Sequence, residues 1–241
     1  MKLSAPIHRL KRQAKLLSRD RKIPLHAALD TIANGEGFKS WSMLSQMKDG
    51  TITSIAELYS RLDPGDLVLI GARPGHGKTL LSLRVLIEAM KRGKRGLFFS
   101  LEYNFRDIAA RFQSLDADIH SYASYFAFDN SEAICADYII KCLASEPRGS
   151  FAVIDYLQIL DQNRQKPELM MQIKTLKNFV RQSRMTILCI SQIDRSYDAE
   201  QKSCPDLKDV RLPNPLDLRL FNKACFLNNA EISFHKLEAY P

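Results

Sequence analysis

The chain has 241 residues, of which 45% are hydrophobic and 26% are charged, and its formal net charge is +8. These proportions are ordinary for a globular protein, and no run approaches the roughly 18 apolar residues that a membrane span needs. The totals exclude a membrane protein and leave room for one α/β domain with a small appendage.

The positive charge is concentrated near the start of the chain. Residues 1–50 contain ten Lys or Arg residues and four acidic residues. Such an excess attracts the phosphate backbone of nucleic acids by releasing condensed counterions. A basic face that is merely solvated has the same composition, so both interpretations stay open.

The N-terminus and the cysteines bear on cellular location. The opening MKLSAPIHRLKRQAK lacks the uninterrupted apolar core of a signal peptide, so we expect a cytoplasmic protein. The five cysteines are odd in number and contain no CxxC pair, which indicates neither a disulfide framework nor a zinc site. We expect them to be reduced and mostly buried.

Residues 1–48 are predicted to form a small basic helical domain. Apolar residues recur at helical spacing from Pro6 to Leu17, with Lys and Arg on the other face. Two further helices are expected, from Pro24 to Ala33 and from Phe38 to Met47. Three helices of this size can bury one small core.

Residues 49–62 are interpreted as a linker followed by a short helix from Ile55 to Leu62, and the larger domain as residues 63–241. Four short apolar runs without polar alternation occupy 67–70, 96–100, 151–156 and 186–191. Strands buried on both faces have this composition, so we predict a mostly parallel sheet flanked by helices.

The last part of the chain departs from this pattern. The polar, proline-punctuated stretch 196–215 is predicted to be a surface loop. KACFLNNAEISFHK then places two apolar-rich runs around Asn228 and Asn229, which indicates a hairpin closing the sheet edge.

GARPGHGKT, residues 71–79, lies between an apolar run and a helical pattern, as a phosphate loop requires. Aligning Gly77, Lys78 and Thr79 with GK[ST] places Ala72 where the general pattern has its first glycine. Alanine is tolerated there if its φ is negative. Lys78 would neutralise phosphate oxygens and Thr79 would offer its hydroxyl to Mg²⁺. The expected nucleotide contacts are Ala72, Arg73, Pro74, Gly75, His76, Gly77, Lys78, Thr79 and Leu80.

Three polar residues follow other predicted strands. Asp155 ends FAVID, at the carboxyl edge where open α/β sheets bind ligands, and is expected to hold Mg²⁺ directly or through water. Glu102 lies just beyond the strand at 96–100, where a carboxylate can orient and partly deprotonate an attacking water. Gln192 follows the strand at 186–191, where its amide can sense the γ-phosphate.

Together ARPGHGKT, FFSLEY, VIDYLQIL and CISQIDRS resemble, in order and spacing, the ATPase domain of DnaB-like replicative helicases, over roughly residues 51–200. The resemblance implies a RecA-like P-loop NTPase core that binds ATP with Mg²⁺. By position, Lys78 and Thr79 match the Walker A residues, Asp155 the Walker B aspartate, Glu102 the catalytic glutamate and Gln192 the sensor glutamine. A RecA-type order also places the strand at 96–100 beside the phosphate-loop strand.

The resemblance further implies ring assembly, or another oligomer or protein partner, and contact with single-stranded DNA. The sequence lacks the family's K-x-R pair, which reaches into the neighbouring subunit's ATP, after Gln192, and the basic helical segment differs from the family's larger N-terminal domain. The candidate finger residues that remain are Arg195, Arg211, Arg219, Lys223 and Lys236. The cations placed to touch DNA phosphates from loops are Arg164, Lys166 and Lys202.

Three functions are compatible with these motifs. The first is an oligomeric ATP-hydrolysing protein that acts on DNA as a helicase or helicase-like ATPase. The second is an ATP-gated regulatory or recruitment module without unwinding activity. The third, a small-molecule kinase, shares the phosphate loop but predicts an arginine-rich lid, in place of which the chain has the DnaB-type motifs.

Overall fold

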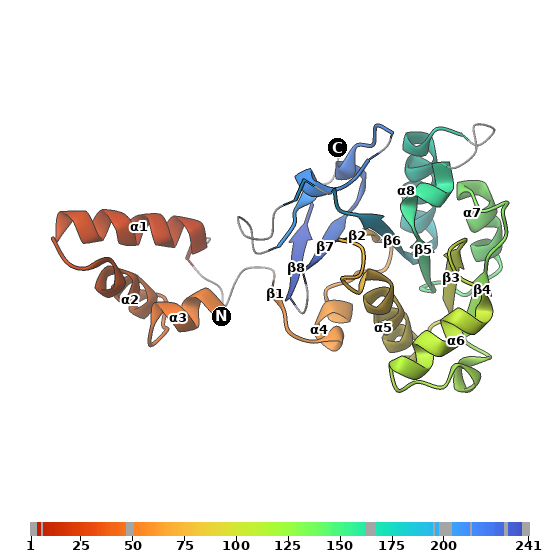
Figure 1. Ribbon diagram of the computed structural model, residues 1–241, viewed down its shortest axis with the longest axis horizontal. Helices are drawn as coiled ribbons and strands as arrows, with labels where there is room; N and C mark the ends of the chain where they lie inside the picture. The colour runs from red at the N-terminus through yellow and green to blue at the C-terminus, as the bar shows by residue number, and fades with distance from the viewer. Residues whose placement is uncertain are drawn as a thin grey trace. The chain divides into compact units, whose positions relative to one another are not determined.

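The computed structural model describes residues 4–5, 7–46, 51–161, 167–194, 196–197, 204–212, 214–228 and 231–237. The chain forms two compact units, Met1–Thr51 and Ile52–Pro241 (Figure 1). Of the predicted features, Arg164, Lys166, Arg195, Lys202 and the turn residue Asn229 lie outside the described residues. Within the described part of the chain, no helix is long and apolar enough to cross a membrane.

The first unit contains the three predicted helices: α1 (Ile7–Asp20), α2 (Leu25–Gly35) and α3 (Trp41–Gln46). They bury a small core of Leu10, Ala33 and Leu44, because apolar residues at helical spacing meet on the inner faces. The helices are confirmed, but α1 continues past its predicted end at Leu17 to Asp20.

The outer face of α1 is basic. Lys11, Arg12, Lys15 and Arg19 are all exposed on this helix. In contrast, the carboxylate of Asp30 is engaged within the unit, where its Oδ1 accepts a hydrogen bond from the backbone N–H of Trp41 at 2.7 Å. No ion pair among the described residues includes these four cations of α1.

The second unit alternates strands and helices. Its first helix is the short α4 (Ile55–Ser60), where the hydroxyl of Ser54 accepts from the backbone N–H of Glu57 as an N-cap. The helices that follow are α5 (Lys78–Lys91), α6 (Phe105–Ser114), α7 (Ala136–Ala144) and α8 (Leu169–Ser183). The strands are β1 (Thr51–Ile52), β2 (Leu67–Ala72), β3 (Gly96–Ser100), β4 (Phe126–Asp129), β5 (Phe151–Asp155), β6 (Thr186–Gln192), β7 (Lys223–Asn228) and β8 (Glu231–Lys236).

These strands form one sheet in the order β1-β8-β7-β2-β6-β5-β3-β4. The pairings β2 with β6 and β7, β5 with β6 and β3, and β3 with β4 are parallel. The prediction that β3 lies beside the phosphate-loop strand β2 is wrong, because β6 and β5 lie between them. The strand β3 instead pairs with β5, the strand that ends in Asp155, and Ser100 lies opposite Asp155 in this pairing.

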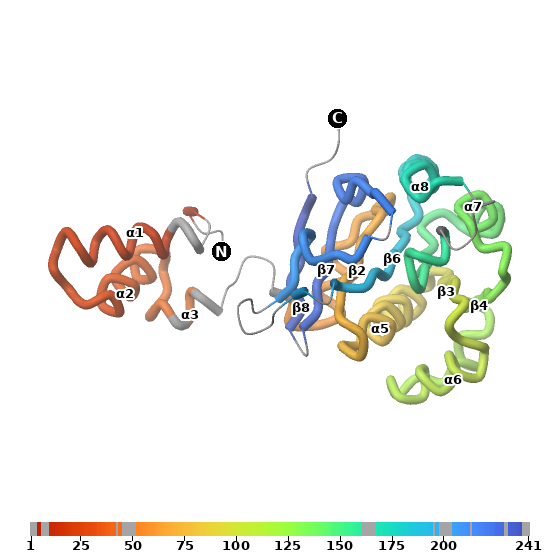
Figure 2. Tube along the Cα trace, turned by 45° about the horizontal axis from the view of Figure 1, so that its top comes forward, coloured from red at the N-terminus to blue at the C-terminus, as the bar shows by residue number. Residues whose placement is uncertain are grey.

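Helices cover both faces of the sheet, as predicted. Alternate strand residues belong to different clusters: Leu67 and Leu69 pack with α7 and α8, whereas Val68 and Ile70 pack with α4, α5 and α6. Figure 2 shows α5 and α6 on one side of the strands and α7 and α8 on the other. This double coverage explains why the central strands read as continuous apolar runs.

The predicted C-terminal hairpin is present as antiparallel β7 and β8, with Asn228 opposite Glu231. The first residue of β7, Lys223, is buried and its Nζ lies 2.5 Å from carboxylate oxygens of both Asp63 and Asp66. The interpretation of Lys223 as a candidate finger is wrong, because this ion pair holds its ammonium inside the unit.

Two further expectations were incomplete. The strand β4 was not predicted, since only Phe126 of its residues is buried and its apolar run is short. The stretch 196–215 was predicted as a surface loop, yet its described part includes the buried residues Tyr197 and Val210. Val210 forms a β-bridge with Ile193, which ties this segment to the end of β6.

Candidate nucleotide-binding site

The carboxyl ends of the parallel strands bring the predicted site residues to one edge of the sheet. Side chains alternate along a strand, so Asp155 points to the same face as Val153, and Gln192 to the same face as Ile190. Both are on the side covered by α5. Three of the motifs separated in sequence are therefore collected beside the start of this helix.

The loop between β2 and α5 has the backbone that a phosphate loop needs. Gly75 and Gly77 both have φ of 81°, which is the left-handed region that glycine adopts without strain. Gly77 is the N-cap of the 14-residue α5, whose first turn begins at Lys78. The N–H groups of a first helical turn have no partner within the helix, so they and the helix dipole favour an anion at this end.

The first position of the motif is occupied by Ala72 without strain. Ala72 is the last residue of β2, is fully buried, and pairs with Gln192 and Leu227 on the two neighbouring strands. Its φ is not positive, so the condition set for alanine at this position is met. The preceding Gly71 has a different role, because a Cβ there would lie 2.7 Å from Cδ1 of Phe226.

We expect Gly71→Ala to lower the stability of the fold by about 1 to 3 kcal/mol, because the added methyl overpacks a buried contact. A fall in Tm of several degrees, measured by differential scanning calorimetry, would show it. The double variant Gly71→Ala/Phe226→Leu should lose less than the sum of the two single variants, because the smaller side chain vacates the space. Additive losses would contradict this packing argument.

Thr79 and Asp155 are in direct contact. The Oγ1 of Thr79 donates a hydrogen bond to Oδ2 of Asp155 at 2.8 Å, and both side chains are buried. The other oxygen, Oδ1 of Asp155, is buried and has no hydrogen-bond partner among the described residues. An unpartnered buried carboxylate oxygen beside a hydroxyl fits a hard cation such as Mg²⁺, which prefers oxygen ligands.

Burial raises the pKa of Asp155 to about 6. The hydrogen bond from Thr79 opposes this rise in pKa, the carboxylate of Glu102 adds to it, and the charges of Lys78 and Arg111 oppose it. The charges of Glu102, Lys78 and Arg111 therefore all act on the carboxylate of Asp155 at this edge of the sheet. A bound cation would favour the ionised form and so remove the cost of burying this charge.

We expect Asp155→Asn to stabilise the protein when nucleotide and Mg²⁺ are absent. The folded pKa lies above the unfolded one, so the stability that Asp155 contributes is complete below about pH 4 and is lost as the pH rises through about 6. At about pH 8 the variant should gain up to roughly 3 kcal/mol in urea unfolding. The exposed Asp137→Asn serves as the control, and an Asp155→Asn gain that does not depend on pH would contradict this assignment.

Most of the predicted phosphate-loop contacts line one hollow of about 420 Å³. Of the predicted residues it contains Gly75, Gly77, Lys78, Thr79 and Leu80. The opposite wall comes from α6 and the turn before it, through Tyr103, Ala110, Arg111 and Ser114. The size and the loop at its base suit the triphosphate end of a nucleotide.

Three more of the predicted phosphate-loop contacts line a second hollow, of about 400 Å³. Arg73, Pro74 and His76 meet Gln192 there, together with Ile193 and Arg211. The backbone N–H of Arg211 donates to the carbonyl of Gln192 at 2.8 Å, and its guanidinium Nη1 lies 3.5 Å from the side-chain Oε1 of Gln192. The structure therefore places Gln192 beside the loop but not in the hollow that contains Lys78.

Glu102 lines neither hollow. It is exposed, and its backbone N–H donates to Oγ of Ser100, whose strand pairs with that of Asp155. Its carboxylate is nevertheless close enough to Asp155 to raise the pKa of that residue. This location at the rim, between bulk water and the buried aspartate, is compatible with the predicted contact to a water molecule.

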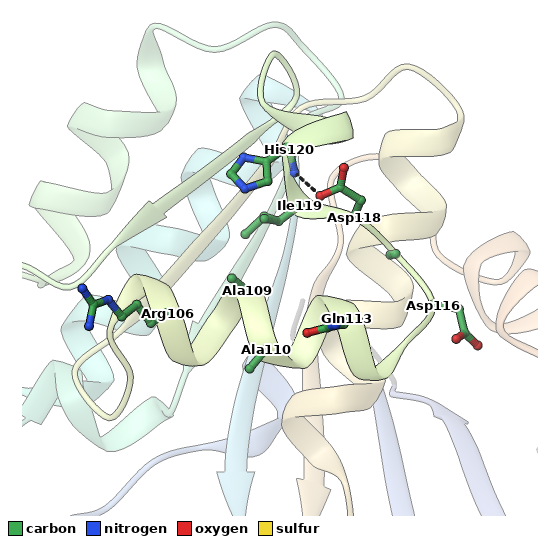
Figure 3. A pocket seen from close by; sticks show the side chains of 9 residues that line it. Arg106, Ala109, Ala110, Gln113, Asp116, Asp118, Ile119 and His120 are labelled. Atoms are coloured by element: carbon green, nitrogen blue, oxygen red, sulfur yellow. Dashed lines mark hydrogen bonds between the residues drawn. The ribbon is translucent and has the colours of Figure 1, made fainter.

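A larger hollow, of about 830 Å³, lies elsewhere. Figure 3 shows it between α6 and the segment before β4, with Arg106 and Gln113 on the helix and Asp118 and His120 across from them. It shares Ala110 with the loop hollow but contains no residue of the phosphate loop. Its size alone therefore does not make it the nucleotide site.

Sequence reasoning missed Tyr103 and Arg111. The signal for Arg111 was weak: it is an arginine on the helix that follows Glu102, between the buried positions Ile108 and Phe112. Two of the candidate fingers have neighbours within the second unit. Arg219 forms an ion pair with Asp217 at 2.8 Å, and Arg211 lies beside Gln192.

Comparison with known proteins agrees with these features. The family model described as the KaiC ATPase matches residues 50–209. The replicative DNA helicase DnaB of Geobacillus stearothermophilus is 26% identical over 204 residues, which cover 68% of this chain and 45% of the helicase. A probable plasmid replicative DNA helicase of Chlamydia muridarum is 27% identical over 227 residues, covering 78% and 50%. The chain thus spans about half the length of the curated relatives it matches.

Solved structures show the same fold. A KaiC-like protein of Pyrococcus horikoshii superposes with a TM-score of 0.54 at 16% identity, over 73% of this chain and 80% of that one. A DnaB-like replicative helicase, studied with its interactions with primase, gives 0.57 at 18% identity over 90% and 64%. The predicted RecA-like core with a mostly parallel, helix-flanked sheet is confirmed, and so is the resemblance to DnaB-like ATPase domains.

Proposed function

The chain belongs to the KaiC family of ATPases, and from that premise we propose that it binds ATP with Mg²⁺ and hydrolyses it as a DnaB-like protein acting on DNA. The observation that carries the proposal is the contact between Thr79 and the buried Asp155, at the first turn of α5 and beside Lys78. Hydroxyl, carboxylate, ammonium and helix N-terminus are the groups that a phosphate loop combines.

Each residue has a defined task in this proposal. The ammonium of Lys78 donates hydrogen bonds to phosphate oxygens and offsets their charge, and the glycine-rich backbone supplies further N–H donors. Thr79 and Asp155 hold Mg²⁺, which when bound neutralises charge on the phosphates. Glu102 orients the attacking water from the rim and acts as the base that partly deprotonates it.

Gln192 has an indirect task. It ends β6, the strand between the phosphate-loop strand and the Asp155 strand, and its carbonyl is bonded to the backbone of Arg211. Its side-chain Oε1 also lies 3.5 Å from Nη1 of Arg211, so a movement of the amide can be passed to the segment after β6. We assign Gln192 the role of a sensor of the γ-phosphate on this basis.

Action on DNA and self-association rest on the relatives. The matched proteins are named replicative DNA helicases, and the chain after Gln192 offers no K-x-R pair for such a site. We propose that the protein works as an oligomer in which a neighbouring subunit or another protein supplies the missing cation. Single-stranded DNA is the proposed nucleic-acid partner.

Steady-state ATP turnover of the full chain, with and without single-stranded DNA, tests the proposal. We expect Mg²⁺-dependent hydrolysis that DNA stimulates. Hydrolysis that is indifferent to DNA would remove the DNA part, and absence of nucleotide binding would remove the whole proposal. Duplex DNA of the same length serves as the control for general electrostatic attraction.

A second function is favoured by the basic first unit. With Lys11, Arg12, Lys15 and Arg19 exposed on α1, this unit can recruit a polyanion or an acidic partner while ATP gates the second unit. The protein would then be a recruitment module without unwinding activity. Native mass spectrometry with an ATP analogue shows whether the chain forms a ring, and unwinding of a forked duplex is measured beside it. A ring that also unwinds the duplex contradicts the recruitment role.

A further inference from the structure

The exposed face of α1 concentrates positive charge in the first unit. The buried residues Leu10 and Ala14 mark the side of this helix that packs inward. Each residue turns an α-helix by about 100°, so the positions of four exposed cations fall within an arc of roughly 100° on the side turned away from that core. These four cations, which we call the basic stripe, are Lys11, Arg12, Lys15 and Arg19.

The acidic residues of the same segment do not neutralise the basic stripe. Asp30 accepts a hydrogen bond from the backbone N–H of Trp41, and the carboxylate of Glu36 accepts from the backbone N–H of Ser4 at 2.8 Å. Asp20, the one acid in the sequence of α1, is its last residue. No ion pair among the described residues includes a cation of the stripe. Its charge is therefore not compensated by an ion pair within the described chain.

The dimensions of the basic stripe fit the backbone of double-stranded DNA. From Lys11 to Arg19 the helix rises by roughly 12 Å, at about 1.5 Å per residue. Over this length a duplex carries about seven negative charges, and one of its strands carries about half as many. The major groove is also about 12 Å wide, so cations at the two ends of the stripe can reach phosphates on both sides of it. A duplex therefore offers the stripe more contacts than a single strand does.

The other side chains of the first unit also favour a duplex. Proteins that bind single strands combine cations with aromatic rings on which the bases stack. The two aromatic residues within positions 1–50, Phe38 and Trp41, are both partly buried against the core of the unit. An acidic protein surface would attract the stripe as well, but it has no condensed counterions whose release would add to the affinity. Phosphates of duplex DNA are thus the partner that this surface fits best.

We propose that the basic stripe of α1 binds the phosphate backbone of double-stranded DNA, without reading the base sequence and without requiring ATP. This inference rests on the recruitment role proposed above for the first unit, and it names the partner that is recruited. The contact is distinct from the single-stranded DNA proposed as the partner of the ATPase. It would bring the chain to a duplex before any single strand is exposed.

The test is the salt dependence of binding between the full chain and a short labelled duplex of mixed sequence, measured by fluorescence anisotropy without nucleotide or Mg²⁺. Four phosphate contacts predict that affinity falls by at least about 100-fold between about 50 and 200 mM salt. The variant Lys15→Ala/Arg19→Ala removes two of these contacts. It should bind more weakly at low salt, and its fall in affinity over the same range should be smaller by about tenfold.

Matched variants separate this surface from general charge and from a structural effect. Lys91→Ala/Lys141→Ala removes two exposed lysines from α5 and α7 of the second unit and should leave affinity and salt dependence nearly unchanged. Leu16→Ala truncates an exposed apolar side chain of α1 and should also bind as the unaltered protein does. Thermal unfolding shows whether each variant folds. Lys11→Ala/Arg12→Ala removes the other half of the stripe and keeps the test valid if the first pair does not fold.

Several outcomes would overturn the inference. An unchanged salt dependence in both stripe variants would reduce the stripe to a solvated surface, and an equal loss in Lys91→Ala/Lys141→Ala would reduce the effect to net charge. A large loss in Leu16→Ala would indicate apolar docking. A single strand that binds as tightly as the duplex, with the same loss in the stripe variants, would contradict the choice of a duplex. Poly-glutamate that competes as well as unlabelled duplex of equal charge would assign the stripe to an acidic protein.

The result also stands apart from the ATPase proposal. Turnover of ATP in the absence of DNA should be the same in Lys15→Ala/Arg19→Ala as in the unaltered protein, because the stripe lies in the first unit and the phosphate loop in the second. Duplex binding without nucleotide binding would remove the ATPase proposal and leave this inference in place. Nucleotide binding and turnover without salt-dependent duplex binding would remove this inference alone.

Discussion

Lys78→Ala should abolish nucleotide binding and leave the fold intact. The ammonium is the only side-chain cation that the described phosphate loop contributes to the hollow at the start of α5, and its loss leaves backbone donors alone on that side. Charge-assisted hydrogen bonds of this kind are each worth about 1.5 to 3 kcal/mol, so we expect affinity to fall by at least about 100-fold. Equilibrium binding of a fluorescent ATP analogue measures it.

The matched control for this variant is Lys91→Ala. Lys91 is an exposed lysine in the last turn of the same helix, far along α5 from the loop. The control should bind nucleotide as the unaltered protein does and should melt at a similar temperature. If Lys78→Ala retains most of its affinity, GARPGHGKT is a glycine-rich turn and the site lies elsewhere.

Glu102→Gln should keep nucleotide affinity within about twofold and slow hydrolysis by about 100-fold to 10,000-fold, because the amide can hold the water but cannot accept its proton. Single-turnover kinetics with saturating ATP separates the chemical step from binding. The variant should therefore accumulate bound ATP, which makes it useful for capturing any oligomer.

Glu132→Gln is the control for this change, since Glu132 is an exposed glutamate in the turn after β4. It should hydrolyse ATP at the unaltered rate. Full turnover in Glu102→Gln would show that the base was assigned wrongly. Asp155 is not the alternative base in this proposal, because its Oδ2 accepts from Thr79 and its buried Oδ1 is assigned to Mg²⁺.

The local features of the site could be predicted because they depend on neighbouring residues. A strand, a glycine-rich turn and a helix in succession identify Lys78 and Thr79, and an aspartate ending an apolar run identifies Asp155. The structure brings Thr79 and Asp155 within 2.8 Å, although 76 positions separate them. Parallel strands with their carboxyl ends at one edge make that meeting a general consequence of the fold.

The order of the strands could not be predicted from the same pattern. Whether β3 lies beside β2 or beyond β6 and β5 depends on how the crossover helices pack, and each apolar run is compatible with either position. The environment of Lys223 could not be predicted either. The sequence shows only that a lysine is present, whereas the folded chain buries its ammonium beside Asp63 and Asp66. Asp63 lies 160 positions earlier in the chain.

Arg111 illustrates a residue that only tertiary structure reveals. In the sequence it is one of two arginines on α6, the other being Arg106. In the structure the two arginines line different hollows, and only Arg111 shares one with Lys78. The rotation of α6 about its axis, set by the burial of Ile108 and Phe112, decides which arginine faces the phosphate loop.

Calorimetric titration of the full chain with a non-hydrolysable ATP analogue, with and without Mg²⁺, tests the central claim most directly. The geometry of Thr79 and the unpartnered oxygen of Asp155 predicts binding that Mg²⁺ tightens by about tenfold or more. Absence of binding under both conditions, or binding that Mg²⁺ leaves unchanged, would contradict a Mg²⁺-dependent ATP site at this edge of the sheet.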